Sequence, residues 1–381
     1  MKNFVTIFPY MNNVHLIKDV GQVGNALAHQ GDYKAKVVCY KNGMYPNADG
    51  EVENVSMEFI KNKGKIFFLE KAILDYITKH AHEIDVLHLF HLSKMTIYYG
   101  LHYKKCRKDG KLYIKMDTDG KILDNEIIYS KKRVFDWFHK RKEKKFFKVL
   151  DLISAENPTL VEKLKTKYPI LERKTILVTN GVNNKFIENE FISRKPFKQK
   201  ENILLSVGRI GAPDKNYEML FDLLPHLELK DWKIVLVGPV QPEYKNRMDL
   251  YLENNEEWKP KIQFSGPIYD RKKLYKYYDR SKIFFLMSKF ESFGIALIEA
   301  MYFGNFIIGT TGMSSFDYIT SNKKYGWNAS VKSPKSYAEL INKAITNQEK
   351  LEQLIPSMKK HVAQHFYWTD IVTQLNKKLN K

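Results

Sequence analysis

The sequence predicts an α/β protein built from two doubly wound parallel units, and three observations lead to this prediction. The chain has 381 residues, too many for one ordinary core and suitable for two domains of under roughly 200 residues each. Short apolar runs alternate with amphipathic stretches along nearly the whole chain, as in parallel α/β architectures. The alternation is interrupted over Asn189–Glu201 and then starts again, which indicates two consecutive units.

In the first unit, each expected strand is a short apolar run rich in β-branched and aromatic residues. The expected strands are Phe4–Phe8, Lys34–Tyr40, Ile84–Phe90, Leu112–Met116, Leu150–Ala155 and Thr175–Val178. Helices are expected over Ser93–Lys108 and Lys131–Lys148. We therefore predict a first domain over residues 1–190, with ligands at the carboxyl ends of its strands.

The second unit follows Asn189–Glu201, which has no clear periodicity and is interpreted as a linker. Its expected strands are Ile203–Val207, Trp232–Val237, Ile262–Ser265, Ile283–Met287 and Phe306–Gly309. Apolar residues recur at helical spacing over Phe366–Leu379, which predicts a terminal helix that packs back on the first domain. The predicted second domain covers residues 200–364, and the terminal helix covers residues 365–381.

Composition bounds the class of protein. Hydrophobic residues make up 44% and charged residues 28%, as in globular proteins. The start of the chain lacks the long apolar core of a signal peptide, and Cys39 and Cys106 lack metal-ligand spacing, so we expect a cytoplasmic protein. The 63 basic and 43 acidic residues give a formal charge of +20, which favours polyanionic partners. A solvated lysine-rich surface explains the charge equally well.

The densest group of small, polar and acidic residues is Ser288–Gly309. An apolar strand leads into it, and a helix is expected to begin near Phe293. Free backbone N–H groups at a helix N-terminus bind phosphate, and Gly294 lets the backbone approach a ligand closely. Glu291 precedes this helix, and Glu299 lies roughly 7–8 Å further along its axis. Each carboxylate is expected to accept hydrogen bonds from hydroxyls on one side of a bound diphosphate, unless both are merely solvated.

Two cations are expected near the same place. Arg209 follows the first strand of the second unit, where doubly wound sheets hold their ligands. Lys215 follows a loop of glycine, proline and aspartate, next to the start of a helix. The pair could neutralise a leaving diphosphate without a metal ion. The alternative is an ordinary basic loop.

These motifs resemble glycosyltransferase family 4, whose members are retaining enzymes of the GT-B fold. The resemblance rests on Val207-Gly208-Arg209 with Lys215-Asn216, and on Glu291-Ser292-Phe293-Gly294 with Glu299. It covers about residues 150–380. It implies two Rossmann-like domains that face each other across a cleft, with the C-terminal helix returning to the first domain.

The resemblance also implies a hexosyltransferase that binds a nucleotide sugar. A hexose or N-acetylhexosamine would move, with retention, from a nucleotide sugar to a polysaccharide, glycolipid, cell-wall polymer or glycoprotein. A UDP-sugar is favoured as the donor, with a GDP-sugar as the alternative. The departing diphosphate would take the proton of the acceptor, and no metal or other cofactor would be required. The implied donor-binding residues are Arg209, Lys215, Ile268, Glu291, Ser292, Phe293, Gly294, Ile295 and Glu299. Of these, Arg209, Lys215 and Glu291 are also the implied catalytic residues of the second unit.

The first unit departs from the family pattern. Asp117 stands where many members have a histidine in the acceptor cleft, so we expect it to be a catalytic residue that contacts the acceptor. His88 and His91, at the end of an expected strand, are alternatives, although such histidines are more often structural. Gly21 lies in a segment that resembles the glycine loop bordering the acceptor in GT-B enzymes, and it is expected on the acceptor side.

Two rival interpretations remain open. Asp117 and Asp119 form an Asp-x-Asp motif, which in GT-A glycosyltransferases holds Mg²⁺ or Mn²⁺ against the diphosphate. Alternatively, the chain is a non-catalytic basic module that binds a membrane or nucleic acid.

Basic and aromatic residues alternate over Lys131–Lys148, as in helices that lie on anionic membranes. A helix that buries its aromatic side chains against the first domain explains the same pattern. We expect a peripheral protein at the inner face of the cell membrane, with no nucleic-acid partner.

Overall fold

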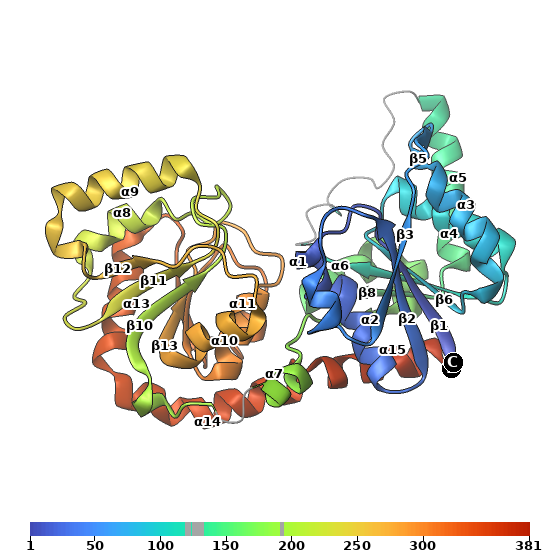
Figure 1. The fold of residues 1–381 in the computed structure, drawn as a ribbon. Coiled ribbons are helices and arrows are strands. Elements are labelled where there is room, and N and C mark those ends of the chain that lie inside the picture. The colour runs from blue at the N-terminus through green and yellow to red at the C-terminus, as the bar shows by residue number, and fades with distance from the viewer. Residues whose placement is uncertain (119–122, 124–132, 191–193) are drawn as a thin grey trace. The chain divides into compact units, whose positions relative to one another are not determined.

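Two compact units make up the structure, a computed structural model that describes residues 1–118, 123, 133–190 and 194–381 (Figure 1). Unit 1 comprises Met1–Asn183 and Tyr367–Lys381, and unit 2 comprises Asn184–Phe366. Each unit contains a large parallel sheet with helices packed on it. The prediction of two doubly wound α/β units is confirmed.

The sheet of unit 1 has seven strands in the order β3-β2-β1-β6-β7-β8-β9. Its strands are β1 Lys2–Ile7, β2 Tyr33–Tyr40, β3 Val55–Ile60, β6 Val86–Phe90, β7 Lys111–Met116, β8 Leu152–Ala155 and β9 Thr175–Leu177. A small antiparallel hairpin is formed by β4 Lys65–Ile66 and β5 Leu69–Glu70. Core residues of α2 and α15 gather in one cluster and those of α3, α4, α5 and α6 in another. The helices are α1 Asn13–Leu16, α2 Asp19–His29, α3 Lys71–His80, α4 Lys94–Cys106, α5 Arg133–Val149, α6 Pro158–Lys167 and α15 Trp368–Leu379.

The sheet of unit 2 has six strands in the order β12-β11-β10-β13-β14-β15. Its strands are β10 Glu201–Val207, β11 Lys233–Val237, β12 Ile262–Phe264, β13 Ser281–Phe285, β14 Phe306–Thr310 and β15 Gly326–Ala329. Helix α13 contacts α8, while α11 contacts α10 and α14. The helices are α7 Asn184–Glu190, α8 Met219–Leu223, α9 Pro242–Asn254, α10 Arg271–Arg280, α11 Ile295–Phe303, α12 Phe316–Ile319, α13 Pro334–Thr346 and α14 Gln348–His365.

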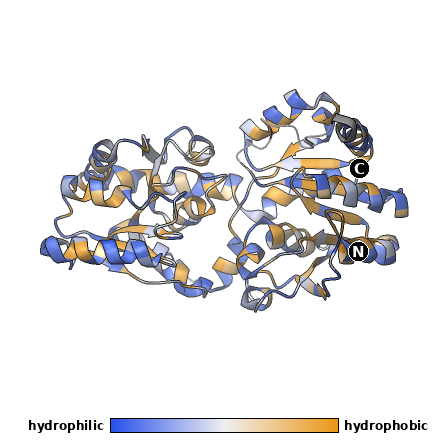
Figure 2. Cartoon of the chain, turned by 90° about the horizontal axis from the view of Figure 1, so that it is seen from above, coloured by the Kyte–Doolittle hydropathy of each residue, from blue (hydrophilic) through white to orange (hydrophobic). Residues whose placement is uncertain are grey.

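Burial on both faces explains the composition of the central strands. Every residue of β6, β13 and β14 is buried, so these strands show no alternation of buried and exposed side chains. Figure 2 shows hydrophobic residues along the strands of both units. Side chains cap several of the helices between strands. Ser93, Asn157 and Asp270 each accept a hydrogen bond from a backbone N–H in the first turn of α4, α6 and α10.

Two features differ from the sequence-based expectation. Strands β3 and β15 were missed because they lie at sheet edges and are not continuous apolar runs. The unit boundary at Asn183 lies before α7, which the sequence assigned to the first domain. Helix α7 belongs to unit 2, where Glu190 forms an ion pair with Lys272 of α10 at 2.5 Å.

Helix α15 belongs to unit 1 although it follows unit 2 in the chain. Trp368 is 2% exposed and packs in the core cluster that α15 shares with α2. Polar contacts reinforce the packing, since the Gln30 amide donates to the Thr369 carbonyl at 2.9 Å and to the Thr373 hydroxyl at 3.0 Å. Among the described residues, every helix is too short or too polar to cross a membrane.

We predict that Trp368→Ala destabilises unit 1 by about 3–5 kcal/mol, because it removes a fully buried indole and leaves a cavity. Thermal unfolding followed by circular dichroism measures the effect. The matched control is Trp137→Ala, which removes an indole that is 58% exposed and should change stability by less than about 0.5 kcal/mol. Equal effects of the two substitutions would show that α15 contributes little to unit 1.

Candidate functional site

The candidate site of unit 2 lies where the strand order of its sheet reverses. Strands β10 and β13 are neighbours, and the chain proceeds to β11 on one side and to β14 on the other. Loops that follow two such strands diverge and leave room for a ligand at the carboxyl edge of the sheet. Arg209 follows β10, and Glu291 follows β13. The sequence-predicted residues therefore lie at the switch point.

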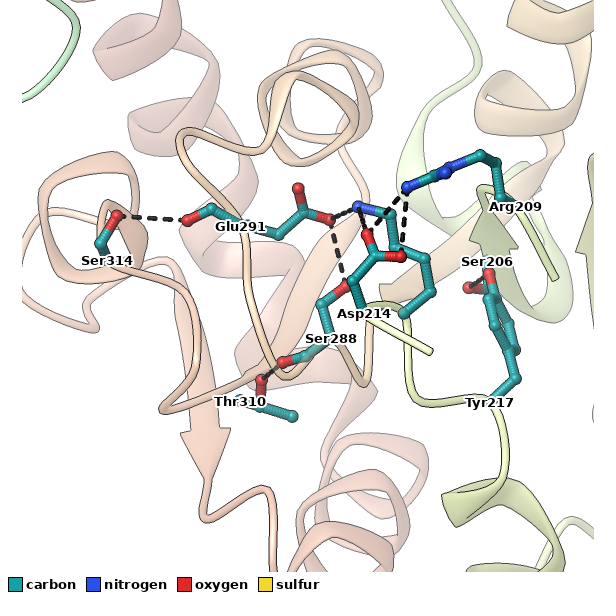
Figure 3. Close-up of polar contacts among 9 residues, drawn as sticks. Ser206, Arg209, Asp214, Tyr217, Ser288, Glu291, Thr310 and Ser314 are labelled. Carbon is teal, nitrogen blue, oxygen red and sulfur yellow. Dashed lines mark hydrogen bonds and ion pairs between the residues drawn. The ribbon is translucent and has the colours of Figure 1, made fainter. Parts of the chain in front are cut away.

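An ion pair joins these two loops. Lys215 Nζ lies 2.7 Å from Glu291 Oε1 and 3.4 Å from Asp214 Oδ2. The Ser288 hydroxyl donates to the same Glu291 oxygen at 3.1 Å (Figure 3). The side chains of Lys215 and Glu291 are each only 16% exposed, so their attraction is partly shielded from water. Glu291 is thus held in one orientation by a cation and a hydroxyl.

Arg209 is the more accessible cation. Its side chain is 65% exposed, and one guanidinium nitrogen donates to both oxygens of Asp214 at 3.1 and 2.9 Å (Figure 3). An exposed ion pair of this kind contributes at most about 1 kcal/mol. An incoming phosphate can therefore replace Asp214 as the partner of the guanidinium at small cost.

Hydroxyl groups of two serines donate hydrogen bonds to the backbone of the turn before α11. The Ser314 hydroxyl donates to the carbonyl oxygens of Glu291 and Ser292, at 3.2 and 3.0 Å. The Ser315 hydroxyl also donates to the Ser292 carbonyl, at 3.0 Å. Gly294 occupies the N-cap with φ of 99°, a left-handed conformation that glycine adopts without strain. The backbone after Glu291 is therefore fixed before any ligand binds.

Helix α11 begins at Ile295, two residues later than the sequence suggested. The first N–H groups of an α-helix have no partner within the helix, and the positive end of its dipole favours anions. The Phe293 ring is buried and packs edge-on against Phe366, with 6.2 Å between centroids. Phe293 can therefore serve a ligand only through its backbone.

Glu299 lies inside α11 and is buried, with 6% exposure. Its two carboxylate oxygens accept hydrogen bonds from Arg271 and from the Tyr278 hydroxyl, the latter at 3.0 Å. Burial and the Glu299 charge hold the pKa of Tyr278 well above its ordinary value, so this hydroxyl remains a donor. The sequence placed Glu299 beside a ligand but did not reveal these two partners.

Three strand ends of unit 2 approach one another at the same edge. The Gly238 N–H donates to the Gly266 carbonyl at 2.9 Å, and a Cβ atom at Gly238 would lie 1.9 Å from the Gly208 carbonyl oxygen. Only glycine fits at such a distance. Ile268 lies two residues after Gly266 and is partly exposed.

Unit 1 carries a cluster of charged side chains at the carboxyl edge of its own sheet, which we call the unit 1 charge cluster: Asp19, Lys115, Asp117 and Glu156. Lys115 is completely buried, and its Nζ lies 3.3 Å from Asp19 Oδ2. It also donates to the Val178 carbonyl at 3.2 Å. A buried ammonium requires such partners, because burial removes its hydration.

The pKa values of two carboxyl groups of the cluster, Glu156 and Asp117, are shifted in opposite directions. Burial, followed by the nearby charge of Asp117, raises the pKa of Glu156 well above its ordinary value of 4.5. Burial would also raise the pKa of Asp117, but Lys115 and a hydrogen bond with Glu156 hold it below the ordinary value. Burial raises the pKa of Asp19 to about 6, although Lys115 opposes this shift. At a pH between these two pKa values, Glu156 is the protonated partner and Asp117 the ionised one.

The two candidate histidines differ in position, since His88 lies within β6 and His91 directly follows it. His88 is completely buried, its Nδ1 lies 3.0 Å from the Thr6 hydroxyl, and its ring stacks on Tyr113 with 4.7 Å between centroids. Burial lowers the pKa of His88 well below its ordinary value, so it is a neutral core residue. His91 has φ of 58°, and its backbone N–H donates to the Lys115 carbonyl at 2.9 Å. His91 therefore borders the unit 1 charge cluster.

One predicted feature of unit 1 is wrong. Gly21 was expected in a loop, but it lies in the first turns of α2 and is buried. A Cβ atom there would lie 2.2 Å from the Leu16 carbonyl oxygen. The glycine permits α2 to pack against the end of α1, which accounts for its presence without a ligand.

Helix α5 buries some aromatic residues of the basic aromatic segment and exposes others. Phe146 and Phe147 are buried in the core, whereas Trp137 and Phe138 are 58% and 54% exposed. Lys131 lies outside the described residues, as does Asp119 of the Asp-x-Asp motif. In the described parts of the chain, no group of three or more His, Cys, Asp or Glu side chains is arranged to hold a metal ion.

The structure thus brings Arg209, Lys215 and Glu291 together around Asp214. Asp117 and His91 lie in unit 1, and Glu299 lies in the buried pair with Arg271. Several functional candidates were missed by sequence reasoning: Asp19, Lys115, Glu156, Asp214 and Arg271. An isolated lysine in the apolar run of β7 was the one available signal for the unit 1 charge cluster.

Comparison with known proteins relates part of the sequence to a family and the whole chain to a fold. Residues 188–361 match the family model described as glycosyl transferases group 1. A curated relative is mannosylfructose-phosphate synthase from Agrobacterium fabrum, 25% identical over 247 residues, which cover 60% of this chain and 52% of that protein. The chain therefore spans about half the length of this relative.

Solved glycosyltransferases share the fold of the whole chain. A glycosyltransferase from Rickettsia africae matches with a TM-score of 0.77 at 17% identity, covering 100% of this chain and 98% of that one. The HepE protein of Anabaena in complex with UDP matches with a TM-score of 0.72 at 14% identity, covering 100% of both chains. HepE is also known in complex with UDP-glucose. Both large sheets are thus those of the GT-B fold.

We predict that Glu156→Gln removes a pH-dependent loss of stability. A folded-state pKa above the unfolded value means that the folded protein binds more protons, so stability falls as pH rises above about 4.3. Glutamine cannot ionise, so the variant should gain melting temperature relative to the wild type as pH rises from about 5 to 8. Thermal melts across this range measure the difference. Glu162→Gln, at a side chain that is 70% exposed, is the control and should follow the wild type.

Proposed function

We propose that this chain, which carries a glycosyltransferase group 1 domain within a GT-B fold, transfers a hexose or N-acetylhexosamine from a UDP-sugar to an acceptor hydroxyl. The observation that supports this best is the ion pair of Lys215 and Glu291 at the switch point of unit 2, beside Arg209 and the N-terminus of α11. Two exchangeable cations and a helix N-terminus suit a diphosphate. A fixed carboxylate beside them suits a sugar hydroxyl.

Donor binding exchanges the partners of these charges. The diphosphate replaces Asp214 at Arg209 and draws on Lys215, while the N–H groups of Phe293, Gly294 and Ile295 bind its oxygens. Glu291 accepts hydrogen bonds from hydroxyls of the sugar. Glu299 accepts hydrogen bonds from the ribose hydroxyls through lone pairs that are not engaged by Arg271 and Tyr278. Ile268 contacts the nucleotide base. The known complexes of HepE with UDP and UDP-glucose support the choice of base.

The reaction breaks the bond between the anomeric carbon and the diphosphate oxygen, and it forms a bond from that carbon to the acceptor oxygen on the same face. The departing diphosphate takes the acceptor proton, so UDP leaves and the configuration is retained. Negative charge grows on the diphosphate as the bond breaks, and Arg209 and Lys215 stabilise it most at that stage. We propose that no metal ion is needed.

Asp117 and His91 are proposed as acceptor contacts of unit 1. Glu156 and Lys115 keep Asp117 ionised, so it can accept a hydrogen bond from an acceptor hydroxyl. We propose a polysaccharide, glycolipid, cell-wall polymer or glycoprotein as the acceptor. A phosphorylated sugar is the second candidate, because the name of the curated relative describes a product of that class.

The place of action is also a proposal. Exposed Trp137 and Phe138 on the basic helix α5 support attachment to an anionic membrane. We propose a peripheral protein on the cytoplasmic face of the membrane, where nucleotide sugars and lipid-linked acceptors meet.

We predict that UDP-sugars stabilise unit 2 and are slowly hydrolysed in the presence of EDTA. A donor at a hundredfold excess over its Kd adds about 2.7 kcal/mol, which corresponds to about 5–10 °C in melting temperature. Thermal shift and UDP release with UDP-, GDP- and ADP-sugars, each with Mg²⁺ or EDTA, make the test. Activity that EDTA abolishes would favour a metal site at Asp117 and Asp119, and no response to any donor would favour a binding module.

We predict that Glu291→Gln and Lys215→Met each lower kcat by on the order of 10²-fold, because each removes a charge that acts on the reacting donor. Transfer or donor hydrolysis is measured at saturating UDP-sugar, with melting temperature as a check on folding. The matched control is Glu256→Gln, whose side chain is 81% exposed, and it should retain wild-type activity. Full activity of Glu291→Gln would contradict the proposed role of the ion pair.

A further inference from the structure

The hairpin of β4 and β5 presents an exposed phenylalanine at its tip. Ile66 pairs with Leu69, so Phe67 and Phe68 form a two-residue turn. Phe67 is 96% exposed and has φ of 58°, and Ile66 before it is 45% exposed. Two-residue hairpin turns with positive φ at the first position normally have glycine there. A bulky side chain in this conformation is strained, and strain of this kind is a reason to look for a function.

The base of the hairpin is firmly held, so the exposure of Phe67 is a property of an ordered element. Glu70 is 2% exposed and accepts hydrogen bonds from the hydroxyls of Tyr10 and Tyr40, at 2.9 and 3.0 Å. Its backbone N–H donates to the Tyr99 hydroxyl at 2.7 Å. These contacts fix the strand that returns from the tip.

The hairpin is connected to the exposed aromatic residues of α5 through α4. The Phe68 ring packs edge-on against Tyr98, with 5.2 Å between centroids. The Tyr98 hydroxyl lies 3.2 Å from Nδ1 of His139, which follows Phe138 in α5. Figure 1 shows the hairpin and α5 at the same end of unit 1. Trp137, Phe138 and Phe67 thus stand on two neighbouring elements.

The same two elements also carry exposed basic side chains, of which Lys63 and Lys65 form ion pairs with Asp75 and Glu70. The hairpin and its flanks expose Lys61, Lys63, Lys65 and Lys71, and α5 exposes Lys140, Arg141, Lys142, Lys144, Lys145 and Lys148. Exposed aromatic side chains together with many exposed cations match the layers of an anionic bilayer, in which apolar side chains enter below the charged headgroups. A nucleic-acid duplex bound through its phosphates would use the cations and would leave the apolar side chains of Ile66 and Phe67 in water.

We propose that the hairpin tip and the exposed face of α5 together form a membrane-docking surface for anionic lipid, with Phe67 and Trp137 entering the bilayer. We call this the docking surface: Ile66, Phe67, Trp137 and Phe138 with Arg141 and the exposed lysines of the hairpin, its flanks and α5 named above. The inference extends the proposed function, since it names the part of the chain that would bring unit 1 to a lipid-linked acceptor. The docking itself requires neither donor nor acceptor, so it is tested apart from transfer.

The test is co-sedimentation of the full chain with vesicles of phosphatidylcholine alone and of phosphatidylcholine mixed with phosphatidylglycerol. The variant Phe67→Gly suits the positive φ and should not lower the melting temperature. It should weaken partition into the anionic vesicles about tenfold, because it removes one buried phenyl group. Trp137→Gln should act similarly, and Phe67→Trp should restore binding. The control Leu250→Gln changes a side chain that is 60% exposed in unit 2 and should bind as the wild type does.

Each outcome decides the proposal. Selective binding to the anionic vesicles that falls in both aromatic variants supports it. Absence of wild-type binding, or binding that Phe67→Gly leaves unchanged, would overturn it. Binding that disappears with salt, ignores both aromatic substitutions and extends equally to a DNA duplex would also overturn it in favour of a general polyanion surface. If the wild-type chain binds the anionic vesicles but does not hydrolyse UDP-sugars, the result would count against the proposed transfer and leave the docking surface supported.

Discussion

Parallel pairing of all the strands in both large sheets is the constraint on which the rest of the structure depends. It brings the carboxyl ends of the strands and the N-termini of the following helices to one edge of each sheet. That edge favours negative groups, because helix N-termini offer unpaired N–H groups and positive dipole ends. In unit 2 the edge carries Arg209, Lys215 and the start of α11. In unit 1 it carries Lys115 and Asp19, the first residue of α2.

The two units use charge in different ways at these edges. Lys115 is wholly buried with fixed partners, so its removal would leave the Asp19 carboxylate in a site without water, at a cost of about 3–5 kcal/mol. Such a charge stabilises the groups around it and is not readily available to bind a ligand. Lys215 and Arg209 keep part of their surface in water, and a phosphate can replace Asp214 as the partner of Arg209. Unit 2 therefore has the exchangeable charges that binding of an anion requires.

Much of this arrangement could be predicted from the sequence, and the limits have physical causes. Apolar runs that are buried on both faces identify central strands, and a glycine turn before a helix identifies the N-terminus of α11. Ion pairs between segments that are distant in the sequence leave no local signal. The sequence around Lys115 does not identify Asp19 as its partner, and the sequence around Glu299 does not identify Arg271. Edge strands such as β15 alternate too little to be recognised. The position of Gly21 was misjudged because a glycine pair suits a loop and a tight helix contact equally well.

The pair of Glu299 and Arg271 bears on how a donor would be recognised. A carboxylate at the centre of a largely buried helix is unfavourable unless a cation and a hydrogen-bond donor compensate its lost hydration, as Arg271 and Tyr278 do. A carboxylate has about four lone-pair positions, so two hydrogen bonds leave capacity for a ligand. Because the partners fix its orientation, Glu299 would not need to be reordered when hydroxyl groups arrive. Preorganisation of this kind lowers the entropic cost of binding, which explains why a structural ion pair can also belong to a donor site.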